Sequence, residues 1–186
     1  MAKSSEQPAF TLISPETLLH LRQLTARLGA DVPHPAAFAG CFLHLREGDT
    51  VWPRKYAAAA KLTPGVKLAE TAAASAAANE LESLTAMAQA QAKQRPGATL
   101  LAVFREKELL AADAVALGRK LARLHLPVVL ASFGRALPHP GEPQKRIGIP
   151  EIFVAADDAV AVYRVAEESF WRTRTGVGPT WIRCVT

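Results

Sequence analysis

Short apolar runs rich in β-branched and aromatic residues predict buried strands in the C-terminal two-thirds of the chain. We expect these strands at 99–104, 128–133, 152–154 and 180–185. Between the first two, residues 107–125 repeat leucine or alanine every three or four positions, which predicts a helix. A strand, a helix and a strand in close succession favour two parallel strands joined by a right-handed crossover.

The helix expected at 107–125 has an apolar face and a basic face. Arg119 and Arg123 fall between the apolar positions, so we expect both side chains to face solvent. The residues that we expect to face the sheet are Leu110, Leu117, Leu121 and Leu124.

The N-terminal third predicts helices rather than strands. Ser14 and Pro15 are a typical helix start, an N-cap followed by proline at the first helical position, and Gly29 can end that helix. Turns and proline residues separate the further helical stretches, which we expect at 35–46, 54–62 and 67–94.

Together these elements predict an α/β fold, a mainly parallel sheet flanked by helices with a helical N-terminal third. Asp157 or Asp158 is expected to cap a last helix before the final strand. We expect a single domain over residues 1–186, mainly helical in 1–97 and α/β in 98–186, because no linker-like stretch interrupts the pattern.

Composition and charge narrow the class of protein. Of 186 residues 36 are alanine and 49% are hydrophobic, which suits closely packed helices in a globular fold. The net charge is +5, but the basic residues are scattered and form no nucleic-acid motif, so we do not expect a nucleic-acid partner. No apolar run approaches the length of a membrane span, and the N-terminus lacks the apolar core of a signal peptide. We therefore expect a cytoplasmic protein without a membrane partner.

Side chains that carry chemistry are present, but not in recognisable motifs. Cys41 and Cys184 have no metal or redox spacing, so we expect two reduced thiols. The five histidines include no pair at metal-ligand spacing, and no serine lies in a Gly-x-Ser-x-Gly context. The Pro-, Gly- and basic-rich stretch 134–148 predicts an exposed loop. From these residues we expect no catalytic residue and no metal site.

Three stretches, in order along the chain, resemble one enzyme family. The first two are 48–68 (GDTVWPRKYAAAAKLTPGVKL) and 121–130 (LARLHLPVVL). Their sequences, with the C-terminal part, are similar to the alpha subunits of thiamine-diphosphate-dependent 2-oxo acid dehydrogenases, which include the pyruvate, branched-chain and acetoin enzymes. The matching C-terminal residues are Gly148-Ile149-Pro150, Asp158, Ala161-Val162-Tyr163 and Gly176-Val177-Gly178-Pro179-Thr180.

The resemblance implies the thiamine-diphosphate-binding fold and a cofactor site where the strands end. In the family, Gly-Asp-Gly after one strand and Asn after the next hold a divalent ion that bridges the cofactor's diphosphate, and the glycines let the backbone approach. Here Arg105, Glu106 and Lys107 stand at the Gly-Asp-Gly positions, and Arg135 stands at the Asn position. The resemblance therefore implies a lost cofactor site, and we expect no bound cofactor.

Two further family positions also differ. The family's Tyr-Arg pair, whose arginine contacts the diphosphate, falls on Lys55-Tyr56. Its Asp-Gly-Asn-Asp falls on Ala155-Ala156-Asp157-Asp158. The resemblance also implies that the chain lacks a family segment near 70–85 and ends before the family's histidine-containing loop.

The resemblance implies a degenerate, non-catalytic homologue that acts as an interaction or structural module. The alternative is a working alpha subunit that binds thiamine diphosphate and magnesium and needs a partner beta chain, because in the family the cofactor lies between two chains. Both readings imply a homo-oligomer, or a hetero-oligomer with a beta-type subunit, because the family assembles through this domain.

Residues 105–108 (Arg-Glu-Lys-Glu) leave several states open for Glu106. Its carboxylate can ligate a metal, it can be a solvated or ion-paired acid near a helix N-terminus, or all four charges can point into water. If the alignment with the family holds, Glu106 and Arg135 end adjacent parallel strands about 5 Å apart. A carboxylate–guanidinium pair between them would then replace the charge of the metal.

Overall fold

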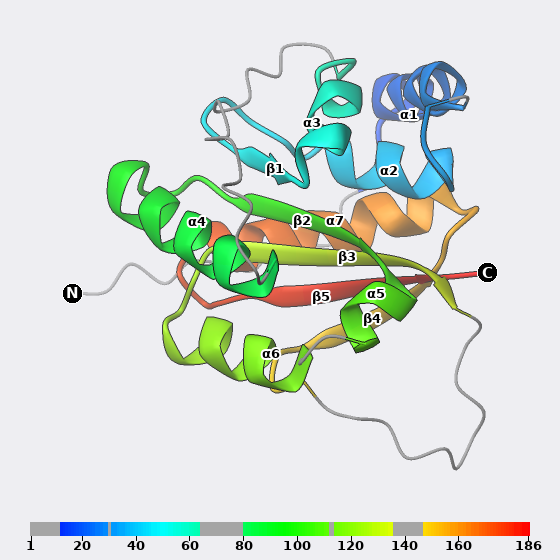
Figure 1. Ribbon diagram of the computed structural model, residues 1–186. Helices are drawn as coiled ribbons and strands as arrows, with labels where there is room; N and C mark the ends of the chain where they lie inside the picture. The colour runs from blue at the N-terminus through cyan, green and yellow to red at the C-terminus, as the bar shows by residue number, and fades with distance from the viewer. Residues whose placement is uncertain (1–11, 30, 64–79, 112–113, 136–146) are drawn as a thin grey trace.

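Five parallel strands form one sheet at the centre of the described part of the chain (Figure 1). The computed structural model describes residues 12–29, 31–63, 80–111, 114–135 and 147–186. The strands are β1 (Thr50–Trp52), β2 (Leu100–Arg105), β3 (Val128–Arg135), β4 (Glu151–Ala155) and β5 (Thr180–Val185).

The strands lie in the order β1-β2-β3-β5-β4, and every neighbouring pair is parallel. The α/β class and the parallel sheet expected from the sequence are confirmed. The four expected strands are present, with bounds within two residues of those expected. The edge strand β1 was not expected, because three residues followed by a proline are too short to show a strand pattern.

Helices cover both faces of the sheet, as expected. On one face, apolar side chains of four helices pack against alternate strand residues such as Leu101, Val103 and Val129. Figure 1 shows α7 running behind the strands, with α1 and α2 beside it. These helices are α1 (Pro15–Leu28), α2 (Pro35–Phe42), α3 (Arg54–Ala60) and α7 (Ala159–Arg174).

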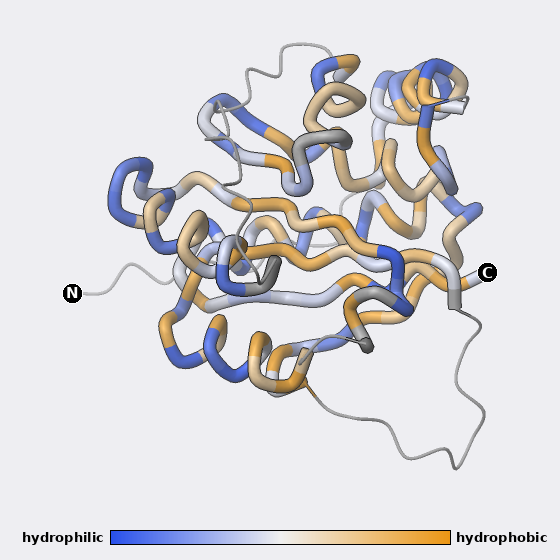
Figure 2. The backbone as a smooth tube through the Cα atoms, in the orientation of Figure 1, coloured by the Kyte–Doolittle hydropathy of each residue, from blue (hydrophilic) through white to orange (hydrophobic). Residues whose placement is uncertain are grey.

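The opposite face packs against α4 (Glu80–Gln94), α5 (Glu106–Ala111) and α6 (Ala114–Arg123). Here the intervening strand residues, including Leu100, Ala102 and Phe104, point into the core. Figure 2 shows β2 and β3 as largely hydrophobic, whereas hydrophilic and hydrophobic residues alternate along α4 and α6. The chain therefore buries two apolar layers, one on each side of the sheet.

The structure describes the helix expected at 107–125 as α5 and α6, and residues 112–113 between them lie outside the described part. Leu117 and Leu121 are buried as expected. The expectation for Leu124 is wrong, because α6 ends at Arg123 and the side chain of Leu124 is 38% exposed. Of the remaining positions, Arg119 and Arg123 are exposed as expected, and the side chain of Leu110 is not described.

The expected helix caps are confirmed at two positions. The Ser14 hydroxyl accepts a hydrogen bond from the Thr17 amide at 3.1 Å and caps α1. Of the two candidates for the last helix, Asp158 is the cap, since its carboxylate accepts hydrogen bonds from the amides of Val160 and Ala161. The helix expected at 35–46 is shorter and ends at Phe42.

Some expectations fall outside the described residues. These include the first part of the helix expected at 67–94 and most of the loop expected at 134–148. In the described ranges, no helix has the length and apolar character that a bilayer span requires.

Gly40 lets α2 approach α7 closely. A Cβ atom at this position would lie 2.8 Å from the Tyr163 amide nitrogen and from the Val162 side chain. The residues that follow α2 are therefore held beside α7, which places the loop at 43–46 along that helix from Tyr163 to Arg174.

Candidate functional site

The charged stretch at 105–108 lies at the carboxyl end of β2, and α5 begins at Glu106 directly after the strand. Arg105 and Lys107 are exposed, whereas Glu106 is buried, with only 2% of its surface exposed. The interpretation in which all four charges point into water is therefore wrong for Glu106. A buried carboxylate needs a charged or hydrogen-bonding partner.

Arg183 of β5 supplies that partner. Its guanidinium forms an ion pair with Glu106 Oε1, and the Ser132 hydroxyl donates to Glu106 Oε2 at 3.0 Å. Ser132 in turn accepts a hydrogen bond from the Trp181 indole N–H at 2.8 Å. Each oxygen of the Glu106 carboxylate is therefore bound by a protein donor.

Arg183 also reaches a second carboxylate. Its Nη1 lies 3.0 Å from Glu151 Oε2, while Glu151 Oε1 accepts a hydrogen bond from the Ile147 amide. The guanidinium carbon lies 4.5 Å from the Phe153 ring centroid and 4.4 Å from that of Trp181. The result is a closed cluster of one cation between two anions, covered by aromatic rings.

The expected pair between Glu106 and Arg135 stays a prediction. β2 and β3 are parallel neighbours and Arg135 is the last residue of β3, so the expected placement of the two positions at neighbouring strand ends is confirmed. The side chain of Arg135 lies outside the described part of the chain. The partner that the structure does show for Glu106 is Arg183, which was not anticipated from the sequence.

The other two family positions do not join this cluster. Tyr56 lies in the core on the other face of the sheet, with its ring 5.0 Å from that of Phe38. The carboxylate of Asp158 is occupied in capping α7. No group of three or more His, Cys, Asp or Glu side chains among the described residues has the arrangement to hold a metal ion.

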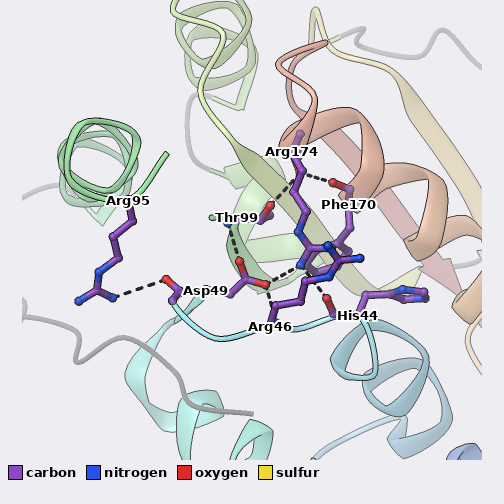
Figure 3. A network of polar contacts seen from close by, with 9 residues as sticks. His44, Arg46, Asp49, Arg95, Thr99, Phe170 and Arg174 are labelled. Atoms are coloured by element: carbon purple, nitrogen blue, oxygen red, sulfur yellow. Dashed lines mark hydrogen bonds and ion pairs between the residues drawn. The ribbon is translucent and has the colours of Figure 1, made fainter. Parts of the chain in front are cut away.

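A second buried carboxylate, Asp49, lies at the amino end of the sheet (Figure 3). Its Oδ1 accepts a hydrogen bond from the Thr99 amide at 2.7 Å, just before β2. Its Oδ2 accepts from the Arg46 amide at 2.8 Å and from Arg174 Nη2 at 2.6 Å. Asp49 therefore joins the start of the sheet to the last turn of α7.

Arg174 also joins this region to a surface hollow. Its Nη2 donates to the His44 carbonyl at 2.7 Å, and its guanidinium lies 4.9 Å from the Phe170 ring. The hollow beside it has a volume of about 480 Å³. Its lining residues are Leu43, His44, Arg46, Tyr163, Glu167, Trp171, Arg174 and Thr175.

The two cysteines are free and buried. Burial raises the pKa of Cys41 to about 12. Burial also raises the pKa of Cys184 well above its usual value, and the nearby Cys41 and Glu106 raise it further. Both thiols therefore stay protonated near neutral pH, which removes them as candidates for a nucleophile.

Sequence reasoning missed Arg183, Asp49 and His44. A signal for Arg183 was available, because it is a single charged residue inside TWIRCV, a stretch expected to be a buried strand. Such a residue requires a buried acidic partner. His44 and Tyr163 gave no comparable signal, because 119 positions separate them in the chain.

No protein-family model matches the sequence, and no curated protein matches it either. A proposal for the function therefore depends on the geometry of the two sheet ends and on the motif resemblance.

Proposed function

We propose that this protein is a degenerate, non-catalytic homologue of the alpha subunits of thiamine-diphosphate-dependent 2-oxo acid dehydrogenases. In this proposal the parallel sheet has the thiamine-diphosphate-binding fold, and the chain acts as an interaction or structural module. The observation that carries the proposal is the ion pair between Glu106 and Arg183 at the position aligned with the family's metal ligand.

The ion pair opposes metal binding for two physical reasons. A divalent cation needs carboxylate oxygens that are free to coordinate it, but both oxygens of Glu106 are bound by Arg183 and Ser132. The guanidinium also places a positive charge beside the carboxylate, where a second cation would be repelled. The protein thus supplies internally the charge that the metal supplies in the family.

The backbone around Glu106 opposes binding of a diphosphate as well. The family uses glycines on both sides of its aspartate, whereas this chain has Arg105 and Lys107. Since α5 begins at Glu106, this segment is a helix start with side chains in place of an open glycine turn. Loss of the cofactor leaves assembly with other chains as the retained property of the family, and we propose a homo-oligomer or a hetero-oligomer with a beta-type subunit.

Calorimetric titration of the purified protein with thiamine diphosphate and magnesium tests this proposal. We expect no binding by the natural chain. The matched comparison restores the family residues with Arg105→Gly, Glu106→Asp, Lys107→Gly and Arg135→Asn in one variant. Micromolar binding by the natural chain, or binding equal to that of a binding-competent restored variant, would contradict the loss of the site and favour a working alpha subunit.

Light scattering tests the assembly. A mass at or above twice that of one chain supports a homo-oligomer. A single chain at all concentrations leaves the hetero-oligomer, which co-purification with a beta-type subunit then tests. Failure of both measurements would contradict the interaction role.

A further inference from the structure

The hollow beside Arg174 lies at the other end of the sheet from Glu106. One wall is a stripe of α7 in which Tyr163, Glu167 and Trp171 follow at intervals of four residues and therefore share one face of the helix. The other wall is the segment at 43–46, which follows α2. A volume of about 480 Å³ lies within the range of small-molecule sites, roughly 300–1,000 Å³.

His44 lines this hollow and has a ring nitrogen that is free of the contact with Tyr163. Its Nε2 lies 2.8 Å from the Tyr163 carbonyl oxygen. Because a carbonyl only accepts, Nε2 must carry the proton, which leaves a lone pair on Nδ1. Burial, with the nearby charges of Arg174 and Arg46, lowers the pKa of His44 to about 4. The ring is therefore neutral near pH 7, and its Nδ1 suits a ligand that donates a hydrogen bond.

The charges along the hollow have two signs. Arg46 and Arg174 lie at the His44 end, and the charge of Arg174 is balanced by Asp49 behind it. Arg46 is exposed and adds a cation at the rim. Glu167 adds an anion beside Tyr163, whose pKa is raised first by burial and then by this carboxylate. A ligand that matches the hollow therefore carries both an anionic group and a donor or cationic group.

Apolar side chains also line the hollow. Trp171 offers a partly exposed indole, and Leu43 lies on the opposite side. The rings of His44 and Tyr163 have centroids only 4.2 Å apart, which fixes the imidazole in place. Apolar surface beside the charged side chains favours a ligand with an apolar part.

We propose that this hollow binds a free amino acid with a large apolar side chain. The carboxylate of the ligand meets the Arg46 guanidinium, its ammonium group meets Glu167 and the lone pair of His44 Nδ1, and its side chain packs on Trp171. This site does not depend on the loss of the cofactor site, because the two lie at opposite ends of the sheet.

Tryptophan fluorescence tests the proposal with defined probes. Trp171 borders the hollow, whereas Trp52 and Trp181 are buried in the core on the other face of the sheet. The probes are L-phenylalanine, 3-phenylpropionate without the ammonium group, phenethylamine without the carboxylate, and glycine without the apolar body. We expect L-phenylalanine to change the fluorescence and to bind about tenfold tighter than each of the other three.

Single variants assign each contact. Arg46→Gln is expected to remove the preference for L-phenylalanine over phenethylamine, which lacks the carboxylate. Glu167→Gln is expected to remove the preference for L-phenylalanine over 3-phenylpropionate, which lacks the ammonium group. Trp171→Phe is expected to abolish the signal. Arg119→Gln, an exposed arginine on α6, is the matched control and keeps both preferences. Circular dichroism verifies that each variant is folded.

Three results would overturn the proposal. The first is no response to L-phenylalanine up to about 10 mM, an affinity weaker than about −3 kcal/mol. The second is equal binding of L-phenylalanine and either single-charge analogue, which would place the ligand in a different chemical class. The third is an unchanged preference in both the Arg46→Gln and the Glu167→Gln variants, which would place the binding elsewhere.

Discussion

The two ends of the sheet each contain a buried carboxylate bound by an arginine, yet they differ in what surrounds the pair. At the carboxyl end, Glu106 meets Arg183, which lies inside a strand beneath the rings of Phe153 and Trp181. At the amino end, Asp49 meets Arg174, which borders a hollow of about 480 Å³. The same pair of chemical groups is thus enclosed at one end and borders a surface hollow at the other.

The two arginines that bind these carboxylates lie in different elements of the fold. At the carboxyl end, Arg183 and Ser132 together bind both oxygens of Glu106, so a metal ion would have to displace one of these donors. An arginine in the last turn of a helix satisfies Asp49 with one nitrogen, Nη2, while the side chain still lines the surface hollow. The usual location of ligands in parallel sheets, beyond the carboxyl ends of the strands, is therefore the closed end here.

The largest effect is expected from Arg183→Met. The substitution leaves Glu106 and Glu151 without their shared cation, and an uncompensated buried charge costs about 3–5 kcal/mol. Urea unfolding followed by circular dichroism measures the loss. The double variant Glu106→Gln with Arg183→Met should recover at least about 2 kcal/mol of it, because it removes the buried charge. No recovery would mean that Arg183 acts through packing alone.

A pH effect is expected at the open end. The pKa of His44 is lowered from 6.5 to about 4, chiefly by burial, so the unfolded chain binds a proton that the folded chain does not. Its contribution is fully present above pH 6.5 and is lost as the pH falls from 6.5 towards 4, at about 1.4 kcal/mol per pH unit at most. Unfolding free energies of the natural chain and of His44→Phe over this range measure it. Equal slopes would contradict the buried, neutral histidine.

Asp49→Asn is expected to cost about 2 kcal/mol. The amide keeps one oxygen for the donors of Thr99, Arg46 and Arg174, and its NH₂ group faces one of them. Glu106→Gln is the matched variant at the closed end. The free energies of unfolding of the two variants show whether Asp49 is bound as strongly as Glu106. A loss of stability below about 0.5 kcal/mol for Asp49→Asn would contradict the place of Asp49 in the network.

The smallest effect is expected from Arg95→Ala. Its guanidinium lies 3.5 Å from the Gly48 carbonyl oxygen on the exposed side of the Asp49 region. A long contact of an exposed side chain contributes less than about 0.5 kcal/mol. A larger loss in urea unfolding would mean that the network around Asp49 extends to this arginine.

The sequence patterns predicted the layers better than the sites. The largely apolar runs in strands such as 100–105 and 180–185 follow from burial on both faces, which is a local property. The helix expected at 107–125 was wrong at its end, because periodicity does not fix the last residue of a helix and α6 ends at Arg123. The edge strand at Thr50–Trp52 is stabilised by pairing with β2, a non-local contact that three residues cannot reveal.

The sites depended on contacts between distant segments. Position 106 was identified from the motif resemblance, but its partner Arg183 is 77 residues away. Asp49 and Arg174 are 125 residues apart. Only the charged residue within a predicted buried strand carried a local signal, because burial of a guanidinium requires an acidic partner.

The most direct test of the proposed loss of the cofactor site is the melting temperature of the natural chain with and without thiamine diphosphate and magnesium. A ligand that binds the folded state stabilises it by about 2.7 kcal/mol at one hundred times its Kd, which is a rise of several degrees for a domain of this size. We predict a change below about 0.5 °C at millimolar cofactor and magnesium. A rise in the melting temperature of several degrees that requires both thiamine diphosphate and magnesium would contradict the proposed loss of the cofactor site.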